Sequence, residues 1–218
     1  MRNMPATLLI ADDEPFVRQA LTQMLTEIGH CVRSAEDGFA ALREIRDEVP
    51  EVLLSDLNMP GMSGFELLSV VRHRFPAIRT IAMSGSFSGN EAPSGVAADA
   101  FYQKGSSILA LLRIMDTLPQ MERHPHAPAS KDAPLWIHCN SRSNSPDATV
   151  TITCPECMRC FPQALGTGYL NRKTECIYCR SVIHYAIVQH ADRMPLQAFQ
   201  QKAVAAARIL QSASNFSY

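Results

Sequence analysis

The sequence lacks the long apolar run that a membrane-spanning helix requires. No stretch of the 218 residues approaches the ~18 uninterrupted apolar residues needed to cross a bilayer. The first residues, Met1 to Pro5, show no apolar signal region and no cleavage site, and an apolar strand pattern follows at once. We therefore expect a cytoplasmic protein with no membrane span.

The chain also lacks a strong charge of either sign. Its 20 Lys and Arg residues nearly balance 21 Asp and Glu residues, for a net charge of -1. Residues 1–133 carry net -5, whereas residues 134–190 and 191–218 each carry only +2. Without a basic stripe or a helix-turn-helix pattern, nucleic-acid binding by the second half is not favoured. No repeat of fixed period appears.

Cysteine is almost absent from the first part of the chain. Of seven cysteines, Cys31 stands alone and the other six fall between positions 139 and 179. In a reducing cytosol such a cluster indicates metal ligands rather than disulfides. We expect Cys31, on a predicted strand, to be a buried core thiol. The chain length predicts one full domain followed by a smaller module.

Four apolar runs are present, and each ends in residues that can do chemistry. The runs are Thr7–Ala11, ending in Asp12 and Asp13; Val52–Ser55, ending in Asp56; Ile78–Met83, ending in Ser84; and Ala100–Gln103, ending in Lys104. Helical patterns separate them, which predicts a parallel sheet. Because open α/β sheets bind ligands at the carboxyl ends of their strands, we expect these side chains to form one site.

Two of the intervening segments need comment. Gly64 to Phe75 predicts a helix with Phe65, Leu68, Val71 and Phe75 turned inward. Between Ser84 and Asp99 the chain has three glycines and a proline. Each such residue costs ~1 to 3 kcal/mol in a helix interior, so we expect any helix there to be short, late or mobile.

The strand-end residues resemble those of a known family. The acidic pair Asp12-Asp13, Asp56 within SDLNMPGMSG, Ser84 and Lys104 resemble, in order, the receiver domain of bacterial two-component response regulators. The resemblance covers about residues 5–120. It implies a flavodoxin-like, doubly wound sheet of five parallel strands in the order 2-1-3-4-5.

The resemblance also implies a chemistry for the site. Three converging carboxylates repel one another unless a cation lies among them, and a hard ion such as Mg²⁺ suits such oxygens. By resemblance, Asp13, Asp56 and the backbone carbonyl of Asn58 ligate Mg²⁺, and Asp12 acts through water. Asp56 would accept a phosphoryl group from a histidine kinase and later lose it by autodephosphorylation, with Lys104 and Ser84 contacting the phosphoryl oxygens. The protein would be a phosphoacceptor, not an enzyme in the usual sense.

Three positions depart from the family pattern. Gly105 follows Lys104 where the family usually has a proline in a cis peptide. Phe101 occupies the position of the aromatic switch but lacks a hydroxyl, and the neighbouring Tyr102 should point to the other face of the sheet. The irregular segment after Ser84 is the third. Together they predict intact phosphorylation with an altered readout.

The remaining cysteines form a second motif. Cys154-x2-Cys157, eighteen residues and Cys176-x2-Cys179 have the spacing of a zinc ribbon, which we expect to bind one structural Zn²⁺. Cys160 can substitute for one of these ligands, and His138 with Cys139 can form half of a second site. We expect these three to be spare residues. Four protein ligands leave no open position for catalysis, so catalysis is the least favoured output.

These motifs divide the chain into four parts. We expect a receiver domain at 5–120, a linker at 121–133, a β-rich zinc-ribbon-like module at 134–190 and an amphipathic helix at 191–212. The leading hypothesis is a phosphorelay response regulator whose ribbon binds a protein partner or a second copy of the chain. The alternative is a transcriptional regulator that binds nucleic acid through the ribbon.

Overall fold

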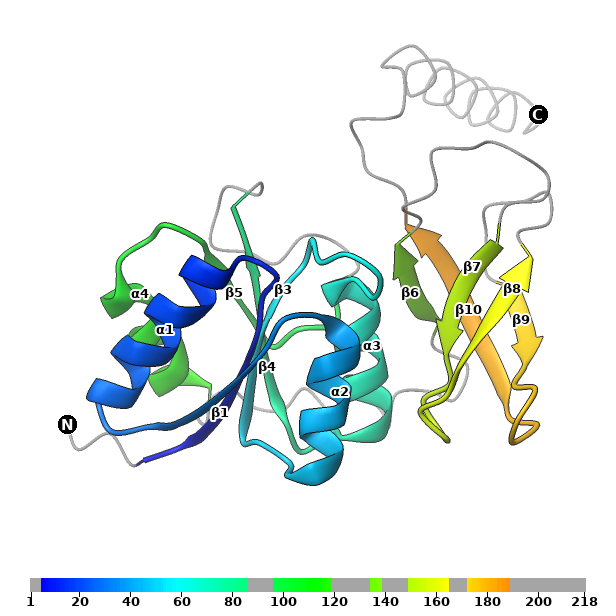
Figure 1. Ribbon diagram of the computed structural model, residues 1–218, viewed down its shortest axis with the longest axis horizontal. Coiled ribbons are helices and arrows are strands. Elements are labelled where there is room, and N and C mark those ends of the chain that lie inside the picture. Colours follow the sequence, from blue (N-terminus) through cyan, green and yellow to red (C-terminus); the bar gives the residue numbers. More distant parts are fainter. Residues whose placement is uncertain (1–4, 86–95, 119–133, 139–148, 165–171, 189–218) are drawn as a thin grey trace, which may run out of the picture. The chain divides into compact units, whose positions relative to one another are not determined.

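The computed structural model describes residues 5–85, 96–118, 134–138, 149–164 and 172–188 (Figure 1). The expected linker at 121–133, the expected helix at 191–212 and Cys139 lie outside these ranges. So does most of the irregular segment after Ser84. None of the helices in the described ranges has the length and apolar character of a membrane span.

The first part of the chain forms a sheet of five parallel strands. The strands are β1 (Thr7–Ala11), β2 (Cys31–Ala35), β3 (Val52–Asp56), β4 (Arg79–Ser84) and β5 (Ala100–Gln103). Their order is β2-β1-β3-β4-β5, so the predicted order 2-1-3-4-5 is confirmed. The order reverses between β1 and β3, and ligands of such sheets bind at that switch point.

Helices cover both faces of this sheet (Figure 1). The helices are α1 (Pro15–Glu27), α2 (Gly38–Asp47), α3 (Gly64–Arg74) and α4 (Ile108–Thr117). Leu8 and Ile10 of β1 lie in one apolar cluster with residues of α1 and α4. Leu9, between them, lies in another cluster with residues of α2 and α3. This alternation is what a strand with both faces buried requires.

The second part of the chain forms short strands, among which β9 with β10 and β7 with β8 pair antiparallel. These are β6 (Leu135–His138), β7 (Thr149–Thr153), β8 (Cys160–Ala164), β9 (Arg172–Glu175) and β10 (Val182–Val188). Strands β6, β10 and β9 form one sheet in that order, and β7 pairs with β8. Thr153 pairs with Cys160, and Glu175 pairs with Val182. Each hairpin therefore closes around one Cys-x-x-Cys turn.

Helix α3 is buried on all sides along its first eight residues, Gly64 to Val71. Phe65, Leu68 and Val71 are buried as predicted, and Phe75 is partly buried. The other face of α3 packs on the second part of the chain. Glu66 accepts a hydrogen bond from the Thr153 amide at 3.1 Å, and Ser69 accepts one from the Trp136 amide at 3.3 Å. Helix α3 is therefore covered on both of its faces.

Cys31 is exposed, so its prediction as a buried core thiol was wrong. Strand β2 is the outermost strand of the five-stranded sheet, and only Ala35 of its five residues is buried. An apolar strand pattern does not distinguish an edge strand from a central one, which explains the error.

The cover over α3 can be tested at Val70, which has no exposed surface and shares a helix face with Glu66 and Ser69. We expect Val70→Asp to lower the free energy of unfolding of the full chain by about 3 to 5 kcal/mol, because it places an unpaired charge in an apolar contact. Chemical denaturation would measure this.

Val49→Asp is the matched control, since Val49 is 52% exposed. It should change stability by no more than about 0.5 kcal/mol. Equal effects of the two substitutions would contradict a buried outer face of α3.

Candidate functional site

Three carboxylates converge at the carboxyl ends of β1 and β3. Asp12 and Asp13 follow β1, and Asp56 ends β3. One carboxylate oxygen from each lies within 4.8 Å of the others. Asp12 is fully buried, and Asp56 is 4% exposed. The structure thus brings together the three acidic residues that the sequence predicted.

Lys104, which follows β5, neutralises part of this charge. Its Nζ lies 2.9 Å from Asp56 Oδ2, 3.0 Å from Asp12 Oδ2 and 3.1 Å from Glu14 Oε1. Burial by itself lowers the pKa of Lys104, but the hydrogen bonds and charges of Asp56 and Asp12 outweigh burial and raise that pKa above its usual value. Lys104 is therefore a cation whenever both aspartates are ionised. Glu14 was not predicted to join the site.

One ammonium does not satisfy three carboxylates. Burial raises the pKa of Asp12 despite the contact with Lys104. Burial, followed by the charge of Asp56, raises the pKa of Asp13. Both shifts oppose the shared ionised state, so a further cation among these oxygens stabilises it. A cluster of hard oxygen ligands with room for water fits Mg²⁺.

The other predicted residues lie around this cluster. Ser84 is fully buried at the end of β4, and its carbonyl accepts the Lys104 amide hydrogen bond at 2.9 Å. Asn58 lies in the loop after Asp56 and is exposed. No peptide bond between described residues is cis, so the bond from Lys104 to Gly105 is trans, and Gly105 has φ +85°. Lys104 reaches Asp56 in spite of the missing proline.

The two aromatic residues of β5 point to opposite sides of the sheet, as predicted. Phe101 lies in the apolar cluster with α2 and α3, and Tyr102 lies in the cluster with α1 and α4. The Tyr102 hydroxyl donates to the Ser106 carbonyl at 2.8 Å. Both rings are buried, with exposures of 4% and 5%. The Tyr102 hydroxyl therefore binds the loop after β5 and does not lie on the face of the sheet where Phe101 packs.

Four cysteines form a second cluster. The sulfurs of Cys154, Cys157, Cys176 and Cys179 all lie within 4.8 Å of one another. The Cys154–Cys179 and Cys157–Cys176 sulfur pairs are each 3.7 Å apart. Zinc bound tetrahedrally at about 2.3 Å from each sulfur requires sulfurs about 3.8 Å apart. The spacing of these four atoms therefore fits Zn²⁺.

The two cysteine turns have matching backbones. In the first, the Met158 amide donates to the Cys154 carbonyl at 2.8 Å, and in the second the Arg180 amide donates to the Cys176 carbonyl at 2.9 Å. Met158 and Arg180 both have positive φ, 56° and 63°. Non-glycine residues adopt this conformation rarely, so its occurrence at equivalent places indicates two copies of one turn.

The thiols of this cluster differ in environment. Burial raises the pKa of Cys154, whereas the Ser181 hydroxyl lowers the pKa of the exposed Cys179 to about 6. Cys160 is not among the four clustered sulfurs, and its sulfur lies 3.5 Å from Thr153 Oγ1. The His138 side chain and Cys139 lie outside the described residues. A bound cation is what lets four adjacent thiols ionise together.

Glu66 is a buried ionisable residue that sequence reasoning missed. It is 4% exposed, and burial raises its pKa to about 7 even though the Thr153 amide and hydroxyl favour the ionised form. The signal available in the sequence was Ser63-x-x-Glu66, the spacing of a helix capping box. Ser63 does cap α3, but the Glu66 carboxylate turns toward Thr153.

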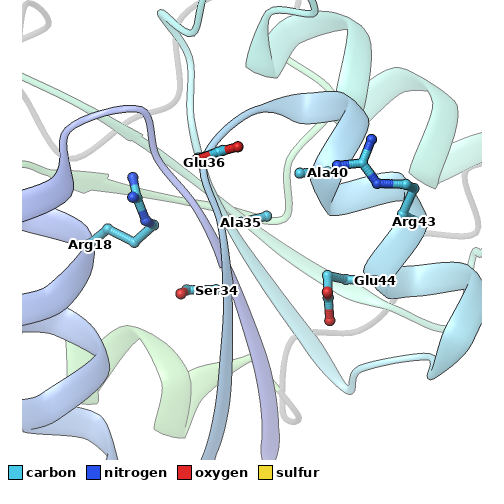
Figure 2. Close-up of a pocket in the computed structure, with 7 residues that line it drawn as sticks. All are labelled: Arg18, Ser34, Ala35, Glu36, Ala40, Arg43 and Glu44. Atoms are coloured by element: carbon cyan, nitrogen blue, oxygen red, sulfur yellow. The ribbon is translucent and has the colours of Figure 1, made fainter.

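A surface pocket of about 290 Å³ lies between α1, β2 and α2 (Figure 2). Figure 2 shows Arg18 on one side and Arg43 on the other, with Glu36 and Glu44 between the two arginines. Its full lining is Arg18, Ser34, Ala35, Glu36, Ala40, Arg43 and Glu44. It contains none of the predicted site residues. The two candidate sites therefore lie elsewhere, at the strand ends and at the cysteine turns.

Comparison with known proteins agrees with the first site. The family model of the response regulator receiver domain matches residues 8–103. The transcriptional activator protein ExaE of Pseudomonas putida is 35% identical over 79 residues, 35% of this chain and 37% of ExaE. The response regulator protein FleR of Pseudomonas aeruginosa is 35% identical over 81 residues, 37% of this chain and 17% of FleR.

A solved structure is also similar to this chain. The crystal structure of NtrX from Brucella abortus matches with a TM-score of 0.50 and 26% identity, over 61% of this chain and 31% of that chain. The matched region thus spans well under half the length of each of these relatives. The family match ends at residue 103, and the cysteine cluster lies beyond it.

The raised pKa of Glu66 predicts a pH dependence. A carboxyl with pKa 4.5 unfolded and about 7 folded holds its proton more tightly in the native chain, so native stability falls as pH rises between these values. Glu66→Gln keeps an acceptor oxygen but cannot ionise. The free energy of unfolding of Glu66→Gln minus that of the wild type should increase by about 2 kcal/mol between pH 5 and pH 8.

Denaturant unfolding of zinc-saturated protein at both pH values would measure this. Taking the difference between variant and wild type removes the pH dependence that metal binding brings to both. Glu36→Gln, at an exposed carboxyl, is the control and should show no such change. A stability difference for Glu66→Gln that does not vary with pH would show that Glu66 is not buried as a carboxyl.

Proposed function

Because residues 8–103 are a response regulator receiver domain, we propose that this chain accepts a phosphoryl group on Asp56 from a histidine kinase and relays the signal through its cysteine module. The observation that carries the proposal is the placement of Lys104 Nζ 2.9 Å from Asp56 in a cluster with Asp12 and Asp13. Phosphoacceptance needs a nucleophilic carboxylate, a cation site and a fixed positive charge within one pocket.

The transfer step follows from these groups. An Asp56 carboxylate oxygen attacks the phosphorus of a phosphohistidine, the P–O bond forms, and the P–N bond breaks with its electron pair left on the imidazole. Asp12, Asp13, Asp56 and the Asn58 carbonyl would hold Mg²⁺, which supplies charge neutralisation. Lys104 would exchange its contact with Asp56 for one with a phosphoryl oxygen, and the Ser84 hydroxyl would donate to another.

We further propose that Cys154, Cys157, Cys176 and Cys179 bind one structural zinc ion. The 3.7 Å sulfur separations and the paired turns support this ligand set. With four protein ligands the ion has no open position, so its role is to hold two small hairpins together. The module is small and most of its buried apolar residues belong to the same cluster as those of α3, so metal binding would supply much of the module's own stability.

The favoured output is a contact with a protein partner or a second copy of this chain. The described residues of the module include Arg159, Arg172, Lys173 and Arg180 against Glu156 and Glu175, and zinc with four thiolates would add about -2. The module is therefore close to neutral. Nucleic-acid binding depends on a net positive charge, which the described residues of the module with bound zinc would not provide.

One observation keeps nucleic acid as the second candidate. The Arg159 guanidinium lies 5.3 Å from the ring centre of Tyr178, which is 50% exposed. Single-stranded nucleic acids stack on such exposed aromatic and guanidinium groups. Salt-sensitive binding of a single strand to the zinc-loaded chain would favour this candidate over a protein partner.

Phosphoacceptance can be tested with a small phosphoryl donor. In Mg²⁺, we expect phosphoramidate to label the wild type once per chain, and Asp56→Asn to abolish the label, because the amide is not a nucleophile. Intact-mass spectrometry would detect it. Asp116→Asn removes an exposed carboxylate of α4 and should leave labelling unchanged. Persistent labelling of Asp56→Asn would place the phosphoacceptor elsewhere.

The zinc site can be tested by metal analysis. We expect one zinc per purified chain and loss of tight binding in Cys154→Ser, because a neutral hydroxyl replaces a thiolate ligand. Removing the metal should unfold the cysteine module, since structural zinc contributes ~10 kcal/mol or more to small metal-bound folds. Cys31→Ser, at an exposed lone cysteine, should keep full zinc. Full zinc in Cys154→Ser would rule out the four-cysteine set.

A further inference from the structure

A continuous series of backbone contacts leads from Asp56 to α3. The Gly64 amide, at the first residue of α3, donates to the Leu57 carbonyl at 3.1 Å. A Cβ placed on Gly64 would lie only 1.9 Å from the Asp56 carbonyl oxygen. The start of α3 therefore rests directly on the backbone of the phosphoacceptor. Any shift of Asp56 that accompanies phosphorylation must be accommodated at this end of α3.

Electrostatics act at the same place. The amino-terminal end of a helix carries a partial positive charge, which attracts added negative charge within its first turn. A phosphoryl group on Asp56 brings roughly two negative charges to the pocket beside that end. The new charge therefore acts on α3 as well as on Lys104.

The first turn of α3 carries the contact onward. Glu66 is the third residue of α3, and its Oε1 accepts the Thr153 amide hydrogen bond at 3.1 Å. Thr153 is fully buried and is followed by Cys154, the first cysteine of the first turn. A helix is rigid over one turn, so a movement of its first residue also moves Glu66. The Thr153 amide must then either move with Glu66, which also moves the adjacent Cys154, or lose its hydrogen bond to Glu66.

We propose that the Asp56 pocket and the four-cysteine site are energetically linked through α3, with Glu66 as the positioning residue that joins helix and cysteine turn. This inference rests on the phosphoacceptor and zinc sites proposed above. A phosphoryl group on Asp56 changes the affinity of the cysteines for zinc. Zinc in turn changes the affinity of the Asp56 pocket for a phosphoryl group, and by the same factor, because binding linkage is reciprocal.

The interface supplies its own control for this link. Ser69, one turn after Glu66, accepts the Trp136 amide at 3.3 Å and so joins α3 to β6. This second hydrogen bond crosses the same interface but ends on a strand that carries none of the four cysteines. Loss of the Ser69 bond should weaken the interface without uncoupling the two sites.

The link can be measured on the full chain with beryllofluoride as the phosphoryl mimic. Competition with a chelator of known affinity gives the zinc dissociation constant in Mg²⁺, with and without beryllofluoride. We expect the wild-type constant to change at least about fivefold, the lower end of couplings between linked sites. The affinity for beryllofluoride, compared between zinc-loaded and zinc-free protein, should change by the same factor.

Variants identify the residue that carries the coupling. Glu66→Ala should bring the ratio of zinc dissociation constants, with and without beryllofluoride, to about one. Glu66→Gln should keep the wild-type ratio because the amide oxygen still accepts from Thr153, and Ser69→Ala should keep it as well. Should Glu66→Ala fail to fold, the wild-type factor and the Glu66→Gln variant still decide the matter. Loss of coupling in Ser69→Ala to the same extent as in Glu66→Ala would overturn the role given to Glu66.

Two negative outcomes are distinguishable. If both ligands bind but neither changes the affinity for the other by more than about twofold, the link is overturned while both sites stand. If the cysteines bind no zinc, or Asp56 binds no beryllofluoride, the proposed function fails and the link fails with it.

Discussion

The burial of α3 between two layers is the constraint on which the rest of the structure depends. One face of α3 packs on the parallel sheet, and the other packs on strands β6 and β7 of the second part of the chain. The first layer fixes Asp56 against the start of the helix, and the second fixes Thr153 against Glu66. Because a packed interior is close to incompressible, neither layer can move without displacing the helix. The two candidate sites thus share one mechanical element.

Both candidate sites are clusters of groups that repel one another when ionised. At the strand ends, three carboxylates share a single ammonium, and burial raises the pKa of Asp12 and Asp13. At the cysteine turns burial raises the pKa of Cys154 and Cys157, so the joint ionisation of four thiols calls for a compensating cation. Lys104 thus compensates part of the charge at the first site, whereas the charge of four thiolates at the second would have to be compensated by a bound ion.

Local patterns in the sequence predicted which residues converge at the strand ends and which four cysteines cluster at the two turns. Asp12, Asp56, Ser84 and Lys104 each end an apolar run, and the order of parallel strands forces such ends to one edge. Each Cys-x-x-Cys turn is likewise a short sequence pattern, so it too can be recognised from the sequence alone.

Contacts between segments that are distant in the sequence could not be predicted from local patterns. Glu66 and Ser69 meet partners 87 and 67 residues away, and no periodic pattern carries that information. One signal was present: Leu67 and Val70 make α3 apolar beyond the stripe of Phe65, Leu68 and Val71, and a helix that is apolar all round is a buried helix.

The covered helix also bears on how this chain can change in evolution. A helix whose outer face is polar can lie against water without a covering module. Here Leu67 and Val70 have no exposed surface and Glu66 is 4% exposed, so this face would meet water if the strands after residue 134 were exchanged for another module. A recombined chain would expose an apolar helix and a buried carboxyl at once. The strands after residue 134 therefore cannot be exchanged without a compensating change in the outer face of α3.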